Sequence, residues 1–210
     1  NHLATLCLTG IVMSCVLFAR SRIRFWHLVS LVGFLSFGLI LTESRTGLVA
    51  AFVLGAAVLY WHRQSQAIRG WRAISVWWAF LIALSLVWVP LNEALLLQPA
   101  RDVVISQDNL RSIMWRQALA AIGESPWIGY GWRQTAVAQK VGAQFVAGSL
   151  PTDYAHNLVL DVVIWLGVPA GVALLGAMGY WFVATARRVE SQTQFFLIAA
   201  ILPFGVHSLT

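Results

Sequence analysis

The sequence predicts an all-α fold, a polytopic integral membrane bundle of about six spans in which one long loop carries an amphipathic helix. Hydrophobic residues make up 59% of the 210-residue chain and charged residues only 10%, and the mean hydropathy is +0.74. A soluble domain with so few charges could not keep its surface hydrated. The apolar residues also fall into runs near about 20 residues, the length that a helix needs to cross the hydrocarbon core.

Six apolar segments are expected to cross the membrane. They are Leu3–Ala19, Trp26–Thr42, Gly47–Trp61, Ala73–Leu91, Asn157–Ala186 and Phe195–Leu209. Gly167-Val168-Pro169 interrupts the fifth, which is either one tilted helix or a short helix that leads into a spanning one. The chain therefore divides into spans 1 to 4 at residues 1–91, a loop at residues 92–155, and spans 5 and 6 at residues 156–210.

Arginines in the short loops predict the orientation. Those that follow the first, third and fifth spans are Arg20, Arg22, Arg24, Arg63, Arg69, Arg72, Arg187 and Arg188. Short cytoplasmic loops are enriched in Lys and Arg, so this side is expected to be cytoplasmic. The loop at 92–155, His156 and His207 then face outward. These anchors supply much of the net charge of +6, so we do not expect a nucleic-acid partner.

The long loop is expected to contain a surface helix. Residues 92–107 look irregular, and Asp108 or Asn109 can cap a helix from about residue 110 to 124. At 100° per residue the apolar side comprises Met114, Trp115, Ala118, Leu119, Ala121 and Ile122, and the polar side Ser112, Arg116, Gln117 and Glu124. Arg111 falls within the apolar side. It is either a snorkelling arginine or a guanidinium aimed at an anion such as phosphate.

Polar residues also stand where the outward ends of the spans are expected. The hairpin at residues 43–47 either holds its charges among lipid headgroups or places Arg45 beside a lipid phosphate. Asp161 lies about one turn inside the fifth span, where a carboxyl needs a partner or a wet cavity. Its spacing from His156 does not predict a His–Asp pair. Histidine nevertheless suits proton abstraction at neutral pH. No Cys/His cluster predicts a metal site, and we expect no cofactor.

Five motifs in one order resemble a known family. They are Glu43-Ser44-Arg45-Thr46-Gly47, Arg111-x-x-x-Trp115-Arg116-Gln117-Ala118-Leu119, Pro126-x-x-Gly129-x-Gly131-Trp132, His156-Asn157-x-x-Leu160 and His207-Ser208. Together they resemble the O-antigen ligase superfamily of O-antigen ligases, O-antigen polymerases and bacterial protein O-oligosaccharyltransferases. The resemblance runs from about Phe37 to Thr210. The second and third motifs look most like the protein O-oligosaccharyltransferase branch.

The resemblance implies a multi-pass enzyme of the bacterial inner membrane with its site at the periplasmic face. Such an enzyme moves a glycan from an undecaprenyl-pyrophosphate carrier to a hydroxyl of an acceptor protein, a lipid A core or another glycan. Direct attack by the acceptor would invert the anomeric centre without a metal. Family members commonly have ten or more spans, so we expect this chain to be a portion of a larger enzyme.

The resemblance also implies roles for single residues. His156 matches the family's histidine and is the expected catalytic base. Arg45, Arg111 and Arg116 are expected to bind the pyrophosphate, because their donors suit phosphate oxygens. The residues expected to support them are Glu43, Asn157, Asp161 and His207.

Two alternatives stay open. One is a non-catalytic lipid or polysaccharide permease subunit, which would use the same arginines to bind an anionic lipid and would need no base. The other is an O-antigen polymerase.

Overall fold

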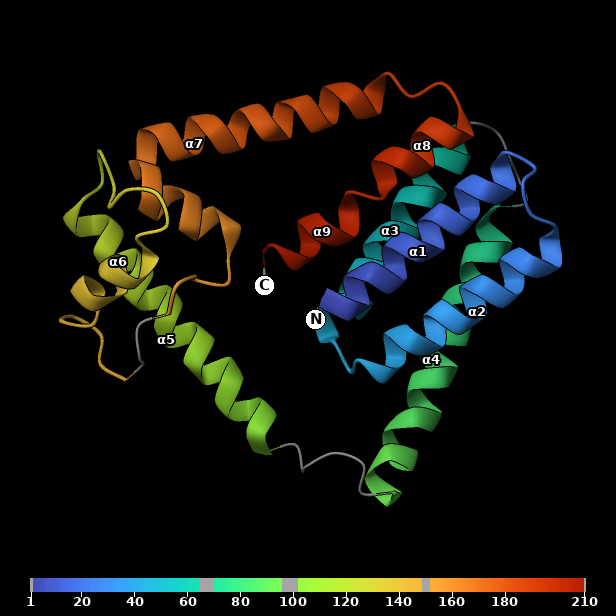
Figure 1. The fold of residues 1–210 in the computed structure, drawn as a ribbon, viewed down its shortest axis with the longest axis horizontal. Helices are drawn as coiled ribbons and strands as arrows, with labels where there is room; N and C mark the ends of the chain where they lie inside the picture. The colour runs from blue at the N-terminus through green and yellow to red at the C-terminus, as the bar shows by residue number, and fades with distance from the viewer. Residues whose placement is uncertain (1, 65–69, 96–101, 149–151, 210) are drawn as a thin grey trace. The chain divides into compact units, whose positions relative to one another are not determined.

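The structure is a computed structural model that describes residues 2–64, 70–95, 102–148 and 152–209. Within these ranges the chain forms α-helices and no strand, which confirms the all-α prediction (Figure 1). The chain divides into two compact units. Unit 1 comprises Asn1–Gln98 and Ala186–His207, and unit 2 comprises Pro99–Thr185 and Ser208–Thr210.

Unit 1 is built from long apolar helices. They are α1 (His2–Ala19), α2 (Phe25–Leu41), α3 (Arg45–Gln64) and α4 (Gly70–Ala94), with the short helices α8 (Gln192–Ala199) and α9 (Leu202–His207). The first four coincide with the first four predicted spans. Of these, α1 and the Arg72–Ala94 part of α4 are long and apolar enough to cross a membrane. Helix α2 and the apolar Arg45–Trp61 part of α3 are shorter, so the number of about six spans stays a prediction.

Two short helices, α8 and α9, lie in the region of the sixth predicted span. Helix α8 starts with a capping box, in which Ser191 Oγ accepts from the Gln194 backbone N–H and the Gln194 side chain accepts from the Ser191 N–H. It ends at Ala199, and α9 starts at Leu202. Pro203 lacks the N–H that would donate to the carbonyl of Ala199, so the helical ladder cannot continue there.

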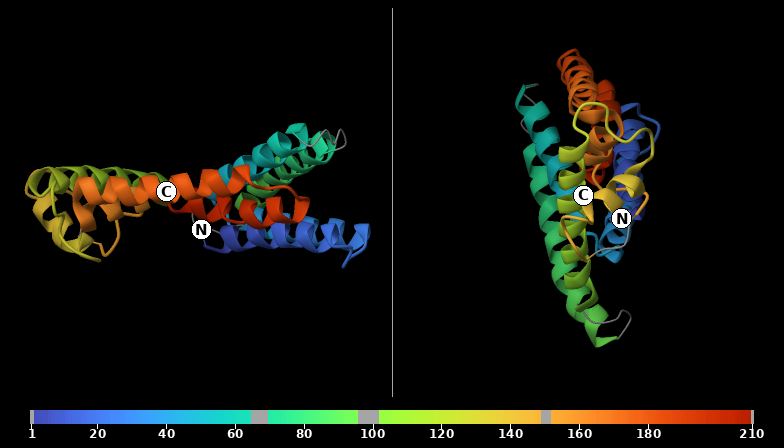
Figure 2. Two further views of the ribbon diagram at one scale, coloured as in Figure 1. Left: turned by 90° about the horizontal axis from the view of Figure 1, so that it is seen from above. Right: turned by 90° about the vertical axis from the view of Figure 1, so that its left-hand side faces the viewer.

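Small residues let the helices of unit 1 pack closely. Helices α1 and α2 lie side by side (Figures 1 and 2). A Cβ at Gly47 would lie 2.7 Å from Cβ of Ala4, so the starts of α3 and α1 nearly touch. A Cβ at Gly55 would lie 2.5 Å from the indole of Trp78 on α4. Close approach through small residues is the usual way in which membrane helices gain packing contacts.

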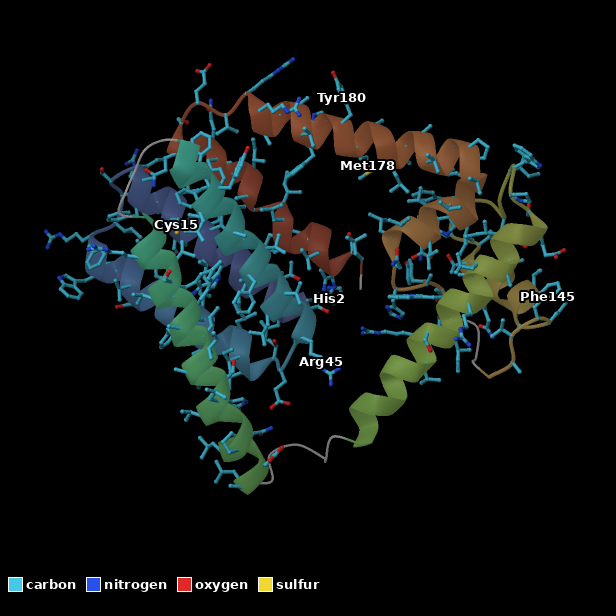
Figure 3. All side chains as sticks on the ribbon, turned by 180° about the vertical axis from the view of Figure 1, so that it is seen from behind. His2, Cys15, Arg45, Phe145, Met178 and Tyr180 are labelled. Atoms are coloured by element: carbon cyan, nitrogen blue, oxygen red, sulfur yellow. The ribbon has the colours of Figure 1, made fainter. Side chains whose placement is uncertain are left out.

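The ends of these helices that the arginine pattern assigns to the outward side lie together. The ring of His2 lies 4.8 Å from the ring of His207. Glu43 Oε1 accepts from Asn92 Nδ2 at 2.6 Å and from Trp88 Nε1 at 3.3 Å. Figure 3 shows Arg45 at the same end of the unit as His2. Within unit 1, therefore, the chain alternates between two ends as the sequence predicts.

Unit 2 contains α5 (Asp102–Glu124), α6 (Thr135–Gly142) and most of α7 (Leu158–Arg187). The prediction for the start of the surface helix was wrong, because α5 begins at Asp102. The predicted irregular segment at residues 92–107 overlaps the end of α4, at Ala94, and the start of α5. Residues 108 and 109 therefore lie inside α5 rather than at its cap. Helix α6 was not predicted.

The buried face of α5 also differs from the predicted one. Gln117, expected on the polar side, is 1% exposed, whereas Leu119, expected on the apolar side, is 60% exposed. The cause is α6, because Gly142 packs directly on the backbone of Gln117 and leaves no room for a Cβ. Gln117 Nε2 donates to the carbonyl of Val146 at 2.7 Å, which satisfies part of the buried amide.

Helix α7 is broken at Gly167, where φ is 78° and ψ is 168°. Figure 1 shows that the parts before and after the break run in different directions. The part at residues 168–187 is alone close to the span length of about 20 residues. Of the two alternatives that the sequence leaves open, the structure thus has a short helix that leads into a longer one. Pro169 fits here because it falls in the first turn after the break, where its missing N–H costs nothing.

The backbone of the turn at residues 126–132 packs against the backbone of α7 at this break and forms hydrogen bonds with it. Tyr130 N donates to the carbonyl of Ile164 at 2.7 Å and Gly131 N to that of Trp165 at 3.1 Å. In the other direction, Val168 N donates to the carbonyl of Pro126 at 2.7 Å. The turn therefore satisfies backbone groups that the broken helix leaves without intrahelical partners.

Two glycines make this approach possible. A Cβ at Gly129 would collide with the carbonyl oxygen of Ile164 and the nitrogen of Gly167, and a Cβ at Gly167 would collide with the carbonyl oxygen of Trp127. Both residues have positive φ, 65° and 78°, which glycine adopts without steric cost. We call this the Gly129–Gly167 contact.

The turn is also fixed to the end of α5. The Tyr130 hydroxyl donates to the carbonyl of Ala121 at 2.8 Å, and Ser125 Oγ donates to the carbonyl of Gly129 at 3.0 Å. Burial, together with the charge of Glu124, raises the pKa of Tyr130 above its usual value. The hydroxyl therefore stays protonated and remains a donor to Ala121.

Replacing Gly167 with alanine tests the contact. We expect Gly167→Ala to destabilise the protein by at least about 2 kcal/mol, because the methyl group meets backbone and the left-handed conformation is strained. The matched control is Gly176→Ala on the same helix, where a Cβ meets nothing within 4 Å. It should leave stability unchanged or slightly raised. Thermal unfolding of the purified protein in detergent measures both, and equal melting temperatures would contradict the assignment.

Candidate functional site

His156 is exposed and has a left-handed backbone conformation, with φ of 55°. This region is uncommon for residues other than glycine, and such residues gather at active sites and ligand clamps. Three of the four positive-φ residues other than glycine in the described part of the chain are Glu43, Arg133 and His156. These three fall within or directly beside motifs that the sequence analysis singled out.

The residue before His156 is held by both of its backbone groups. Ala155 is fully buried. Its N–H donates to Asp161 Oδ1 at 2.9 Å, and its carbonyl accepts from Trp115 Nε1 at 2.9 Å. The backbone that leads into His156 is therefore fixed to both α5 and α7.

The residue after His156 caps α7. Asn157 Oδ1 accepts from the N–H groups of Val159 at 3.0 Å and Leu160 at 3.3 Å, the N-cap arrangement. Asn157 Nδ2 donates to the carbonyl of Leu209 at 3.2 Å. The N–H of Leu158 donates to the carbonyl of Ser208, at 2.6 Å. His156 thus presents its imidazole to the surroundings from a backbone that is fixed on both sides.

Asp161 is 5% exposed and its partners are a hydroxyl and an amide. Its Oδ1 accepts from Thr135 Oγ1 at 2.8 Å as well as from Ala155 N. Thr135 Oγ1 in turn accepts from Trp165 Nε1 at 2.8 Å. Asp161 therefore positions the peptide before His156, and it acts through the backbone rather than through the imidazole.

Sequence reasoning missed Thr135 and Trp165 as members of this network. Both are buried. The available signal was the need of Asp161 for a partner or a wet cavity, which indicated no particular residue. Only the position of α6, which no sequence pattern predicted, selects Thr135.

The two arginines of α5, Arg111 and Arg116, lie on different faces of the helix relative to Trp115. Arg111 is half-buried and lies four residues before Trp115, so it shares the helix face whose indole holds Ala155. Arg116 is exposed and points about 100° away from Trp115 around the helix. Of the two, Arg111 is placed on the side of α5 that faces the His156 segment.

The other candidate residues belong to unit 1. Ser44 caps α3, since its Oγ accepts from the Gly47 N–H at 3.0 Å. Arg45 is the first residue of α3 and is exposed at the helix start, where the helix dipole favours anions. Glu43 bonds to Trp88 and Asn92 on α4, which fixes the turn before Arg45. The ring of His207 lies beside that of His2, tilted by 57°, at the same end of unit 1.

Residues 30–175 match the family model described as O-Antigen ligase. The match covers more than half of the chain. The chain belongs to the O-antigen ligase family. The matched residues include all the motifs discussed above except His207-Ser208.

Two curated proteins of Acinetobacter baylyi are similar to this O-antigen ligase family member over its whole length. One is a general O-oligosaccharyltransferase, 24% identical over 229 aligned residues. The other is a ComP-specific O-oligosaccharyltransferase, 25% identical over 216 aligned residues. The chain spans 38% of the length of each relative. No solved structure matches the chain.

Substitution of Asp161 tests its positioning role in this family member. Asp161→Leu leaves two buried donors without an acceptor and should cost about 3 kcal/mol. Asp161→Asn keeps an acceptor oxygen for Thr135 and Ala155 and should cost less than about 1 kcal/mol. Thermal unfolding in detergent compares them. If the asparagine variant is as unstable as the leucine variant, hydrogen-bond acceptance is not what Asp161 supplies.

Proposed function

We propose that this chain carries the catalytic portion of an enzyme that transfers a glycan from an undecaprenyl-pyrophosphate carrier to an acceptor hydroxyl. Membership of the O-antigen ligase family supports glycan transfer. The names of the two relatives favour a protein as acceptor over a lipid A core. The observation that carries the proposal is the exposed His156, held in a strained conformation between two fixed neighbours.

His156 is the proposed catalytic base. It takes the proton of the acceptor hydroxyl while that oxygen attacks the anomeric carbon of the glycan. The bond from the anomeric carbon to the pyrophosphate oxygen breaks, and its electron pair leaves with the pyrophosphate. One displacement without a protein nucleophile inverts the anomeric centre. A fixed, exposed imidazole suits this step because the base must be aligned with the attacking hydroxyl.

The developing charge on the pyrophosphate needs cationic donors, which arginine supplies without a metal. Arg45 and Arg111 are the preferred candidates and Arg116 the third. The position of Arg45 at the start of α3 adds the favourable helix terminus to its charge. Arg111 lies on the same face of α5 as Trp115, whose indole donates to the carbonyl of Ala155, the residue before His156.

Four further residues are proposed to support these groups. Glu43 holds the turn that presents Arg45, and Asn157 and Asp161 hold the backbone on either side of His156. His207 is proposed as a second functional histidine. Its neighbour Ser208 is bonded to the start of α7.

The proposed location is the bacterial inner membrane, with the site at the periplasmic face. The apolar helices support the membrane assignment. The arginines at or just beyond the ends of α1, α3 and α7 support a cytoplasmic position for those helix ends. The proposed division is therefore four spans at residues 1–91, a periplasmic loop at residues 92–155, and two spans at residues 156–210.

Glycan transfer by the full-length protein in membranes tests the function. Lipid-linked glycan is supplied with a pilin-like protein or a lipid A core as acceptor. We expect His156→Ala to lower the transfer rate by at least about 100-fold, the scale of general-base catalysis. The control His27→Ala removes an exposed histidine beside the cytoplasmic arginines and should leave the rate unchanged. Transfer by His156→Ala at the wild-type rate would contradict the base assignment. A wild-type protein that binds the carrier lipid but transfers to neither acceptor would support the permease alternative instead.

A further inference from the structure

Two aromatic side chains and one arginine that have no role assigned so far are exposed in unit 2, where Trp132 directly precedes an arginine that contacts a tyrosine. They are Trp132, Arg133 and Tyr154, and we call them the Trp132 surface. Trp132 is 68% exposed and Tyr154 is 44% exposed. Arg133 is also exposed.

The Trp132 surface is held in one arrangement. The ring of Trp132 lies 4.6 Å from the ring of Trp165. Arg133 Nη2 donates to the Tyr154 hydroxyl at 3.0 Å, and the guanidinium carbon lies 5.9 Å from the centre of the Tyr154 ring. These contacts fix the three side chains before any ligand arrives, which lowers the entropy cost of binding.

Arg133 has a left-handed backbone, with φ of 59°. A non-glycine residue there costs of order 1 kcal/mol, and such strain gathers at ligand clamps and active sites. A tryptophan that serves only as an interfacial membrane anchor does not require a strained arginine beside it. The strain therefore favours a binding role for the pair over simple anchoring.

The Trp132 surface is joined to the proposed base. Tyr154 lies two residues before His156, so their Cα atoms are at most about 7.6 Å apart. The ring of Trp165, which contacts that of Trp132, donates through Nε1 to the Thr135 hydroxyl. The Thr135 hydroxyl in turn donates to Asp161. Asp161 holds Ala155, the residue before His156. The Trp132 surface is therefore connected to the His156 segment both along the chain and through these hydrogen bonds.

We propose that the Trp132 surface binds a sugar ring of the transferred glycan and so determines which glycans the enzyme accepts. This inference rests on the proposed function. The apolar face of a pyranose, which carries C–H groups, packs on an indole ring. The guanidinium of Arg133 donates to the ring hydroxyls around it. A surface that combines aromatic faces with a few fixed polar groups is typical of small-ligand sites.

Two other occupants fit less well. A lipid acyl chain would use the aromatic rings but not the guanidinium that Tyr154 fixes beside them. A protein acceptor needs only to bring its hydroxyl to His156. The side chains around that hydroxyl have no fixed chemistry that would match an indole face beside a guanidinium. The sugar uses both the ring faces and the donors of Arg133.

Donor kinetics of the full-length protein in membranes test the proposal. Initial transfer rates are measured against lipid-linked glycan at saturating acceptor, and then against acceptor at saturating donor. We expect Trp132→Ala to raise the donor KM about five- to tenfold. The kcat and the acceptor KM should stay within about twofold of the wild type. Trp132→Phe keeps an aromatic face and should restore most of the donor KM.

The matched control is Trp127→Ala. Trp127 is 76% exposed on the same turn, so an interfacial anchoring role would make the two alanine variants behave alike. Equal effects of both variants, or an unchanged donor KM in Trp132→Ala, overturn the proposal, as does a change in the acceptor KM alone. If Trp132→Ala does not accumulate in membranes, Arg133→Gln decides, because Arg133 is exposed. It should raise the donor KM, and an unchanged value overturns the proposal.

The outcomes also separate this inference from the function on which it rests. If the wild-type protein transfers no glycan, the proposed function fails. If the wild type transfers glycan and the Trp132 and Arg133 variants have an unchanged donor KM, only the sugar-binding role fails.

Discussion

The Gly129–Gly167 contact is the constraint on which the arrangement of unit 2 depends. A helix broken in an apolar environment leaves backbone groups unpaired, and each such group costs several kcal/mol, roughly, where water is absent. The turn at residues 126–132 supplies the missing partners through its own backbone. The two backbones can approach this closely only because Gly129 and Gly167 carry no Cβ. Both the direction of the first part of α7 and the position of the turn follow from this contact.

The first part of α7 supports the His156 segment. It carries Asp161 and Trp165 on its buried side, and these two side chains meet at the hydroxyl of Thr135. Asp161 also holds the peptide of Ala155, while Asn157 closes the helix end. His156 is left exposed between them, at a strained φ that its neighbours maintain. As the proposed base, a histidine held in this way would lose little entropy when the acceptor hydroxyl aligns with it.

The predictability of this fold differs between elements for physical reasons. The long apolar runs predicted α1 to α4 closely, because hydrophobic length is set by the bilayer and does not depend on tertiary contacts. Gly167 and Pro169 marked the break in α7 for a similarly local reason. The start of α5, the burial of Gln117 and the existence of α6 were not predictable. The burial of Gln117 depends on the packing of α6 through Gly142 onto α5, which is a long-range contact.

In the candidate site, too, local sequence signals were predictable and long-range contacts were not. The motifs that contain Arg45, Arg111 and His156 were recognisable from the sequence, because short spacing and polar residues beside apolar runs carry the signal. Thr135, Trp165 and the Arg133–Tyr154 pair lie in segments without a periodic pattern and gain their partners only when the chain folds. The left-handed conformation of His156 was also invisible, since histidine does not mark it as glycine would.

The most direct test separates donor binding from the chemical step. The full-length protein is mixed in excess with labelled lipid-linked glycan, and one turnover follows addition of acceptor, with His156→Asn compared with the wild type. Asparagine tolerates the left-handed backbone but supplies no base. If His156 is the base, the variant binds the donor as the wild type does and its transfer step is slower by about 100- to 10,000-fold. Equal transfer rates, or a slower rate explained fully by weaker donor binding, would contradict this account.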